Sequence, residues 1–126
     1  MAPNKDIKIL VVDDYPSMRR ILLNILKQLG YSNLLEAEDG VSALEKLNTE
    51  EIDFVITDWS MPRMNGLELL KAIRGEEKTK NVPVLMVTSE AIRENIIEAV
   101  KAGVNNYVMK PIDARTLAEK INIIFS

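Results

Sequence analysis

The sequence contains no cysteine and no histidine, and these absences exclude several kinds of chemistry. Without cysteine the chain has no disulfide, no thiolate zinc site and no cysteine nucleophile. Without histidine it cannot be a serine–histidine hydrolase or hold a metal through imidazole. The chain could therefore accept a phosphoryl group from a histidine of another protein, but it has no histidine from which to donate one.

An excess of positive charge and long apolar runs are also missing. Sixteen basic residues against nineteen acidic ones give a net charge of −3, so no basic surface predicts binding to nucleic acid. No apolar run approaches the length that spans a membrane, and residues 1–6 lack the apolar core of a signal peptide. We expect a cytoplasmic protein with a flexible N-terminus over residues 1–6 and no nucleic-acid or membrane partner.

The chain has the length and composition of one globular domain, with 126 residues that are 47% hydrophobic and 28% charged. Short apolar runs alternate five times with amphipathic helical patterns, the first opening near Pro16 and the last near Asp113. In the second helical pattern, which follows Gly40, we expect Val41, Leu44 and Leu47 to face the core. The apolar runs predict strands at residues 9–12, 34–37, 54–57, 84–87 and 106–109.

This alternation of strands and helices predicts an α/β fold. Right-handed crossovers between successive strands give a parallel sheet with helices on both faces. Five such units fit a flavodoxin-like, doubly wound (βα)5 domain whose five-stranded sheet has the order 2-1-3-4-5. The second strand is short and flanked by polar residues, so we expect it at an edge of the sheet.

Polar side chains stand where four of the predicted strands end. Asp13 and Asp14 follow the first strand, Asp58 the third, Thr88 the fourth and Lys110 the fifth. Because the carboxyl ends of parallel strands lie at one edge of the sheet, we expect these five side chains to meet where such sheets bind ligands. Taken singly, each has an ordinary interpretation as a helix cap, a strand residue or a solvated lysine. Their matching positions favour a common site.

The residue types at this edge point to magnesium and phosphoryl chemistry. Two carboxylates about 4 Å apart repel by roughly 4 kcal/mol at an effective dielectric constant near 20. Asp13, Asp14 and Asp58 together therefore predict a hard divalent cation, and Mg²⁺ is the natural one. Asp58 could also attack phosphorus and hold an aspartyl phosphate. Lys110 and Thr88 could then stabilise the phosphoryl oxygens.

Other residues are less specific. Trp59 lies next to Asp58 and would report on the site. Tyr107 is either a half-buried strand aromatic or a side chain that moves between inward and outward rotamers. Arg19 and Arg20 are interpreted as solvated surface charge.

Segments from about Lys8 to Phe125 resemble the receiver domain of bacterial response regulators. They are VVDDYPSMRRIL, EAEDGVSALEKL, VITDWSMPRMNGLELL, VLMVTSEAIRENI and GVNNYVMKPI. Trp59, Glu90, Tyr107 and the NGLELL run point to the chemotaxis branch of this family. The resemblance implies a two-component signalling switch rather than an enzyme with an external substrate. It would catalyse its own phosphotransfer from a sensor histidine kinase and its own dephosphorylation, and would bind the flagellar motor switch when phosphorylated.

The resemblance also implies roles for particular residues. Asp58 would accept the phosphoryl group, and Asp13, Asp14, Asp58 and the backbone carbonyl of Ser60 would bind Mg²⁺. Ser60 stands where the best-known chemotaxis regulators carry Asn, so the phosphate lifetime is left open.

Thr88 and Lys110 would contact the phosphoryl group, Thr88 and Tyr107 would form the switch pair, and the peptide bond between Lys110 and Pro111 would be cis. A dedicated phosphatase is a further implied partner, and the protein would be a monomer. The implied partner surface consists of Glu90, Ile92, Ile96, Val100, Tyr107, Met109 and Lys120.

Three other functions would fit parts of the sequence. A paralogue in the same family could act as a phosphate sink or bind a partner other than the motor. A small magnesium-dependent aspartyl-phosphate phosphatase would need a substrate pocket and a cap, for which the chain has no spare length. A flavodoxin-like electron carrier would need a phosphate loop rich in hydroxyls, where this chain has Asp13 and Asp14.

Overall fold

Five strands and five helices alternate along the chain in the computed structural model, which describes residues 3–89 and 92–126. The strands are β1 (Ile9–Val12), β2 (Leu34–Ala37), β3 (Phe54–Asp58), β4 (Val84–Thr88) and β5 (Asn106–Met109). The helices are α1 (Pro16–Gln28), α2 (Gly40–Thr49), α3 (Gly66–Gly75), α4 (Arg93–Lys101) and α5 (Ala114–Ile124). β3 and β4 are each one residue longer than expected, so Asp58 and Thr88 are the last residues of their strands.

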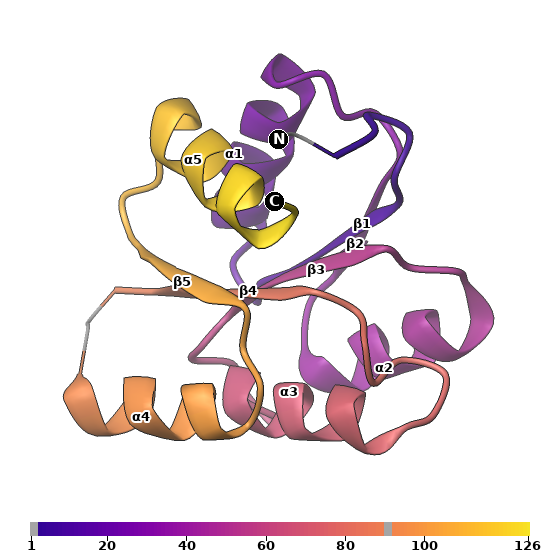
Figure 1. The fold of residues 1–126 in the computed structure, drawn as a ribbon, viewed down its shortest axis with the longest axis vertical. Helices are drawn as coiled ribbons and strands as arrows, with labels where there is room; N and C mark the ends of the chain where they lie inside the picture. Colours follow the sequence, from indigo (N-terminus) through magenta and orange to yellow (C-terminus); the bar gives the residue numbers. More distant parts are fainter. Residues whose placement is uncertain (1–2, 90–91) are drawn as a thin grey trace.

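The strands form one parallel sheet in the order β2-β1-β3-β4-β5. This confirms the predicted fold class, with β2 at an edge. Helices α1 and α5 cover one face of the sheet and α2, α3 and α4 cover the other (Figure 1). The strand order reverses between β1 and β3, which is where a doubly wound sheet opens a crevice at its carboxyl edge.

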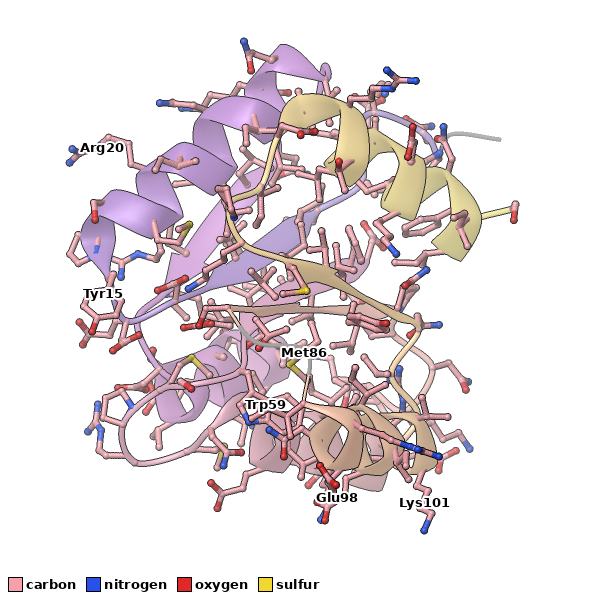
Figure 2. All side chains as sticks on the ribbon, turned by 90° about the vertical axis from the view of Figure 1, so that its left-hand side faces the viewer. Tyr15, Arg20, Trp59, Met86, Glu98 and Lys101 are labelled. Atoms are coloured by element: carbon pink, nitrogen blue, oxygen red, sulfur yellow. The ribbon has the colours of Figure 1, made fainter. Side chains whose placement is uncertain are left out.

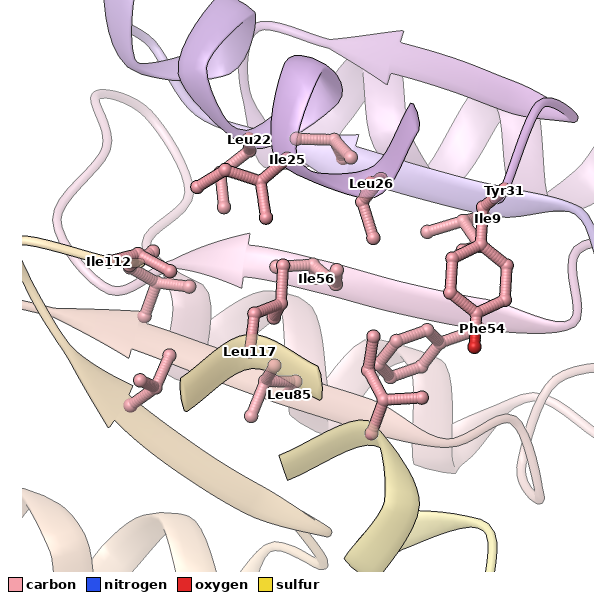
Figure 3. Close-up of a cluster of buried hydrophobic side chains, with 14 residues drawn as sticks. Ile9, Leu22, Ile25, Leu26, Tyr31, Phe54, Ile56, Leu85, Ile112 and Leu117 are labelled. Carbon is pink, nitrogen blue, oxygen red and sulfur yellow. The ribbon is translucent and has the colours of Figure 1, made fainter. Parts of the chain in front are cut away.

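Each face of the sheet has its own hydrophobic core. Successive residues of a strand point to opposite faces, so Ile9 packs toward α1 and α5 whereas Leu10 packs toward α2 and α3. Figure 3 shows the first of these cores, in which Leu26 and Leu117 approach the sheet from two helices. Helix α4 is held more lightly, because Ala99 is the only buried residue among its nine. The strand that carries Asp58 is thus fixed from both sides, and α4 is the least embedded helix.

The helix ends follow the local rules that the sequence suggested. Asp113 caps α5 by accepting a hydrogen bond from the backbone N–H of Thr116, and Pro16 occupies the first turn of α1. Gly30 and Gly103 follow α1 and α4 in left-handed conformations, with φ of 100° and 94°, which glycine adopts without a Cβ clash. No helix within residues 3–89 and 92–126 has the length and apolar character needed to cross a bilayer.

The expectation that Val41 faces the core is wrong, since its side chain is 41% exposed. The buried stripe of α2 contains Ala43 and Leu47, which are four residues apart. At about 100° per residue, Val41 lies roughly 200° around the helix from Ala43 and therefore points to solvent. Apolar character alone does not fix the direction of a side chain, because the first turn of a helix can carry an apolar residue on its outer side.

Candidate functional site

The carboxyl edge of the sheet holds a cleft of about 440 Å³. Asp14 follows β1, Asp58 ends β3 and Lys110 follows β5, so three separate strands contribute charged groups to it. The loop between β3 and α3 forms another part of the wall. The cleft is lined by Asp14, Tyr15, Asp58, Ser60, Met61, Pro62, Ser89 and Lys110.

Asp13, Asp14 and Asp58 converge as the parallel sheet predicts. One carboxylate oxygen from each lies within 4.8 Å of the others. Oδ2 of Asp13 and Oδ1 of Asp14 are buried and accept no hydrogen bond. Buried carboxylate oxygens without such partners are costly, and a hard cation would satisfy them. The three aspartates therefore fit a magnesium ion.

Lys110 forms ion pairs with two members of this cluster. Its Nζ lies 3.3 Å from Oδ1 of Asp58 and 3.7 Å from Oδ2 of Asp13. The peptide bond between Lys110 and Pro111 is cis, as the resemblance implies. The backbone N–H of Lys110 donates to the carbonyl of Thr88 over 2.9 Å, which joins the ends of β4 and β5. The ammonium group is therefore placed to contact an oxygen of any anion that binds at Asp58.

The electrostatics of the two buried aspartates oppose their ionisation. Burial raises the pKa of Asp58, the nearby charge of Asp13 raises it further, and Lys110 lowers it only in part. Burial also raises the pKa of Asp13, with a partial offset from the backbone N–H of Tyr15 and from Lys110. The ionised cluster is therefore less stable than carboxylates in water, and a divalent cation would reverse this.

Thr88 occupies a different position from the charged residues. It ends β4, and with Trp59 and Tyr107 it lines a second, apolar cavity between the sheet and α4. The cavity is small: the centre of a water molecule could move within about 20 Å³ of it. Trp59 lies beside Met86 on this side of the sheet (Figure 2). The next residue, Ser89, lines the cleft, whereas Thr88 lines the cavity together with Tyr107. The end of β4 therefore lies between the cleft and the cavity.

The predicted partner surface extends over α4, β5 and α5. Ile92, Val100 and Met109 are exposed, whereas Ile96, Tyr107 and Lys120 are partly buried. Nζ of Lys120 lies 5.5 Å from the centre of the Tyr107 ring. Glu90 lies outside the described residues. The surface thus combines exposed apolar side chains with a lysine on an aromatic ring, and the predicted roles of all these site residues stay predictions.

Two arginines beside the site have contacts that the sequence did not suggest. Arg19 was expected to be solvated, but its Nη1 donates to the backbone carbonyl of Asp13 over 2.6 Å. Arg63 has a left-handed backbone with φ of 66° and pairs with Asp39, the buried cap of α2. Neither contact follows from periodicity or spacing. Only the cap residue Asp39, directly before Gly40, has a recognisable sequence pattern.

Comparison with known proteins agrees with this geometry. Residues 9–122 match the family model of the response regulator receiver domain. The chain is 56% identical to chemotaxis protein CheY-3 of Vibrio cholerae over 122 residues, which are 97% of this chain and 94% of that protein. It superposes on the crystal structure of CheY4 of Vibrio cholerae with a TM-score of 0.88 at 34% identity, covering 94% of this chain and 98% of the other.

A second similar structure is the receiver domain of sensor histidine kinase PA1611 from Pseudomonas aeruginosa, with a TM-score of 0.85 and 26% identity over 96% of this chain and 99% of the other. That structure has a magnesium ion coordinated in its active-site cleft.

Proposed function

The chain belongs to the response regulator receiver family, among the chemotaxis regulators of the CheY type, and we propose that it is a switch controlled by phosphorylation of Asp58. The observation that carries the proposal is the cleft in which three carboxylates and Lys110 meet, with two buried carboxylate oxygens left without hydrogen bonds. The relatives named chemotaxis proteins support a role in chemotaxis.

In the proposed reaction an oxygen of Asp58 attacks the phosphorus of a phosphohistidine on a sensor kinase. The new O–P bond forms as the P–N bond breaks, and the imidazole nitrogen keeps the electron pair of the broken bond. Lys110 would stabilise a phosphoryl oxygen, and Thr88, which ends β4 directly before Ser89 of the cleft wall, would contact another. Water would later hydrolyse the acyl phosphate and restore the carboxylate.

Mg²⁺ bound in this cleft would neutralise part of the charge on the carboxylates and the incoming phosphoryl group. Asp13, Asp14, Asp58 and the carbonyl of Ser60 would hold it, and the magnesium ion in the PA1611 receiver domain supports this assignment. The protein would act in the cytoplasm, as a monomer, with a sensor kinase upstream and the flagellar motor switch downstream. A dedicated phosphatase would be a further partner.

The test of the phosphoacceptor is labelling of Asp58→Asn. Wild type should take up label from radioactive acetyl phosphate or from a phosphorylated kinase, and chelation of divalent cations should stop the uptake. Asp58→Asn should lose labelling altogether. Asp53→Asn is the matched control, because Asp53 precedes β3 at the opposite end from the cleft. Label that persists on Asp58→Asn, mapped by mass spectrometry to another residue, would show that the nucleophile is misassigned.

The magnesium site has a separate test that requires no phosphorylation. Trp59 is the only tryptophan of the chain and directly follows Asp58, so its fluorescence should fall as Mg²⁺ binds. Asp14→Ala should bind Mg²⁺ more weakly, because it loses one oxygen ligand and one negative charge. Equal affinities of wild type and Asp14→Ala would remove this carboxylate from the site.

A further inference from the structure

The peptide segment that carries two of the proposed magnesium ligands is held by three hydrogen bonds of Asp13. The N–H of Asp13 donates to the carbonyl of Ala37 over 3.1 Å, and Oδ1 of Asp13 accepts from the N–H of Tyr15 over 2.9 Å. The carbonyl oxygen of Asp13 accepts from Nη1 of Arg19 over 2.6 Å. None of these hydrogen bonds uses Oδ2 of Asp13 or Oδ1 of Asp14, and both of these oxygens are buried without a hydrogen bond.

Arg19 is itself held in place at this position. Its Nε lies 3.1 Å from Oε1 of Glu36 on β2, and only 16% of its side chain is exposed. One guanidinium group therefore joins α1 to the end of β1 and to the edge strand β2. The planar fork of arginine can direct Nε and Nη1 to two partners at once, whereas a lysine ammonium lacks this fixed geometry. The next residue, Arg20, is exposed and points away from the protein (Figure 2).

We propose that Arg19 is a positioning residue for the divalent cation: it holds the peptide between Asp13 and Asp14 in the orientation that presents their two oxygens without hydrogen bonds to the cleft. The proposal rests on the magnesium site of the proposed function. The positive charge of Arg19 acts in the opposite direction, because it repels a cation in the cleft. If positioning dominates, removal of Arg19 should weaken Mg²⁺ binding. If charge dominates, removal of Arg19 should strengthen it, so a measurement of Mg²⁺ affinity separates the two effects.

The experiment is a Mg²⁺ titration of Trp59 fluorescence for wild type, Arg19→Ala, Arg19→Lys and Arg20→Ala, at a temperature where all four are folded. Arg20→Ala is the matched control because it removes the same charge from the same helix. Loss of groups that orient metal ligands costs roughly 10- to 100-fold in affinity, so Arg19→Ala should bind Mg²⁺ about tenfold more weakly than Arg20→Ala. Arg19→Lys should fall between wild type and Arg19→Ala.

A second measurement on the metal-free protein separates positioning from a general loss of stability. Hydrogen exchange of the Tyr15 amide, which donates to Asp13, should be faster in Arg19→Ala, while amides of β3 stay as protected as in wild type. Equal acceleration in β3 would show a structural role only and overturn the proposal. So would Mg²⁺ binding by Arg19→Ala that is as tight as in Arg20→Ala, or tighter. If calorimetry shows no Mg²⁺ binding to wild type, the proposed function itself fails.

Discussion

At the scale of single residues, the acidic cluster is a local instability within a well-packed fold. Asp13 is completely buried and Asp58 is 4% exposed, yet the only cation in contact with both is Lys110 in the part of the chain that the structure describes. Three carboxylates cannot be neutralised by one ammonium group. When the three carboxylates are ionised, the cluster carries an excess of negative charge, which favours binding of a divalent cation.

This instability predicts that Asp13→Asn is more stable than wild type when Mg²⁺ is chelated. The amide keeps the shape and the Oδ1 acceptor for Tyr15, but removes one buried charge. We expect a higher melting temperature at pH 8 by several degrees, since 1 kcal/mol corresponds to about 3–6 °C for a domain of this size. Saturating Mg²⁺ should reverse the order, because wild type gains the binding free energy and the variant has lost a ligand.

The pH dependence of this difference follows from the raised pKa of Asp13. A folded-state pKa above the unfolded value means that the folded protein binds more protons between the two values, so stability falls as pH rises through that window. The higher stability of Asp13→Asn should therefore be absent below the pKa that Asp13 has in the unfolded chain. It should be complete above the pKa that Asp13 has in the folded protein. Melting curves of both proteins in chelator across this pH range test it. An advantage that does not change with pH would assign the effect to packing instead of charge.

The residues of the site differ in how far the sequence could predict them. Asp13, Asp14, Asp58 and Lys110 could be placed together because parallel strands bring their carboxyl ends to one edge. Arg19 could not, because its contact with the Asp13 carbonyl depends on how α1 crosses the end of β1. Helical periodicity gives the inward face of α1 but not its angle to the sheet.

At the scale of elements, α3 is packed against β3, which ends in Asp58, without room for a side chain at the start of the helix. The N–H of Gly66 donates to the carbonyl of Trp59 over 2.7 Å. A Cβ added to Gly66 would lie 2.4 Å from the backbone oxygen of Asp58 and 2.7 Å from Sδ of Met86. The methionine could move, but the backbone oxygen belongs to the strand that ends in the proposed phosphoacceptor. Only glycine allows α3 to begin this close to β3.

Replacement by alanine should therefore have opposite effects on stability at the two glycines of α3. Gly66→Ala should lower the free energy of unfolding by about 1–3 kcal/mol, because the added methyl group overlaps the backbone. Gly75→Ala, at the other end of α3, meets nothing within 4 Å and should raise it by up to about 1 kcal/mol through helix propensity. Urea unfolding of both variants measures the difference. A Gly66→Ala protein as stable as wild type would show that α3 can shift away from β3 at little cost.

Element boundaries were largely predictable because caps are local. Asp113 and Pro16 mark helix starts by hydrogen bonding or backbone geometry within one turn of the chain. The capping box at α3, in which Asn65 and Glu68 exchange hydrogen bonds, has the same local origin. The exposure of Val41 was not predictable in this way, since it depends on which side of α2 faces the sheet.

At the scale of the whole molecule, the strand order could be predicted from handedness and from the reversal point of doubly wound sheets. The apolar cavity that lies between the cleft and the partner surface could not be predicted from these rules. Thr88 of β4 and Tyr107 of β5 line one apolar cavity with Ile96 of α4, so the cavity links these two strands to the helix. The C-terminal end of α4 is fixed, because Arg74 donates to the carbonyl of Gly103 through Nε and Nη2. Helix α4 is therefore anchored at this end and only lightly packed along its length.

This connection predicts that phosphorylation changes the affinity of the partner surface. A phosphoryl group on Asp58 should draw the Thr88 hydroxyl toward the cleft, which vacates space beneath Tyr107 and favours its inward rotamer. Allosteric couplings are typically about 1–3 kcal/mol, so a peptide from the flagellar motor switch should bind roughly 5- to 150-fold tighter to the activated protein. Beryllofluoride with Mg²⁺ mimics the phosphoryl group and allows the affinities to be measured by calorimetry.

Thr88→Ala tests whether the coupling runs through this hydroxyl. The variant should still accept label on Asp58, yet bind the peptide with the same affinity with and without beryllofluoride. Thr49→Ala, the same truncation at the exposed end of α2, should keep the full enhancement. Wild type that binds the peptide equally in both states would contradict the switch. Wild type that binds it in neither state would favour a regulator that drains phosphate from the kinase without contacting the motor. Enhancement that survives in Thr88→Ala would place the coupling elsewhere, since a ligand shifts a conformational equilibrium only through contacts that differ between the two states.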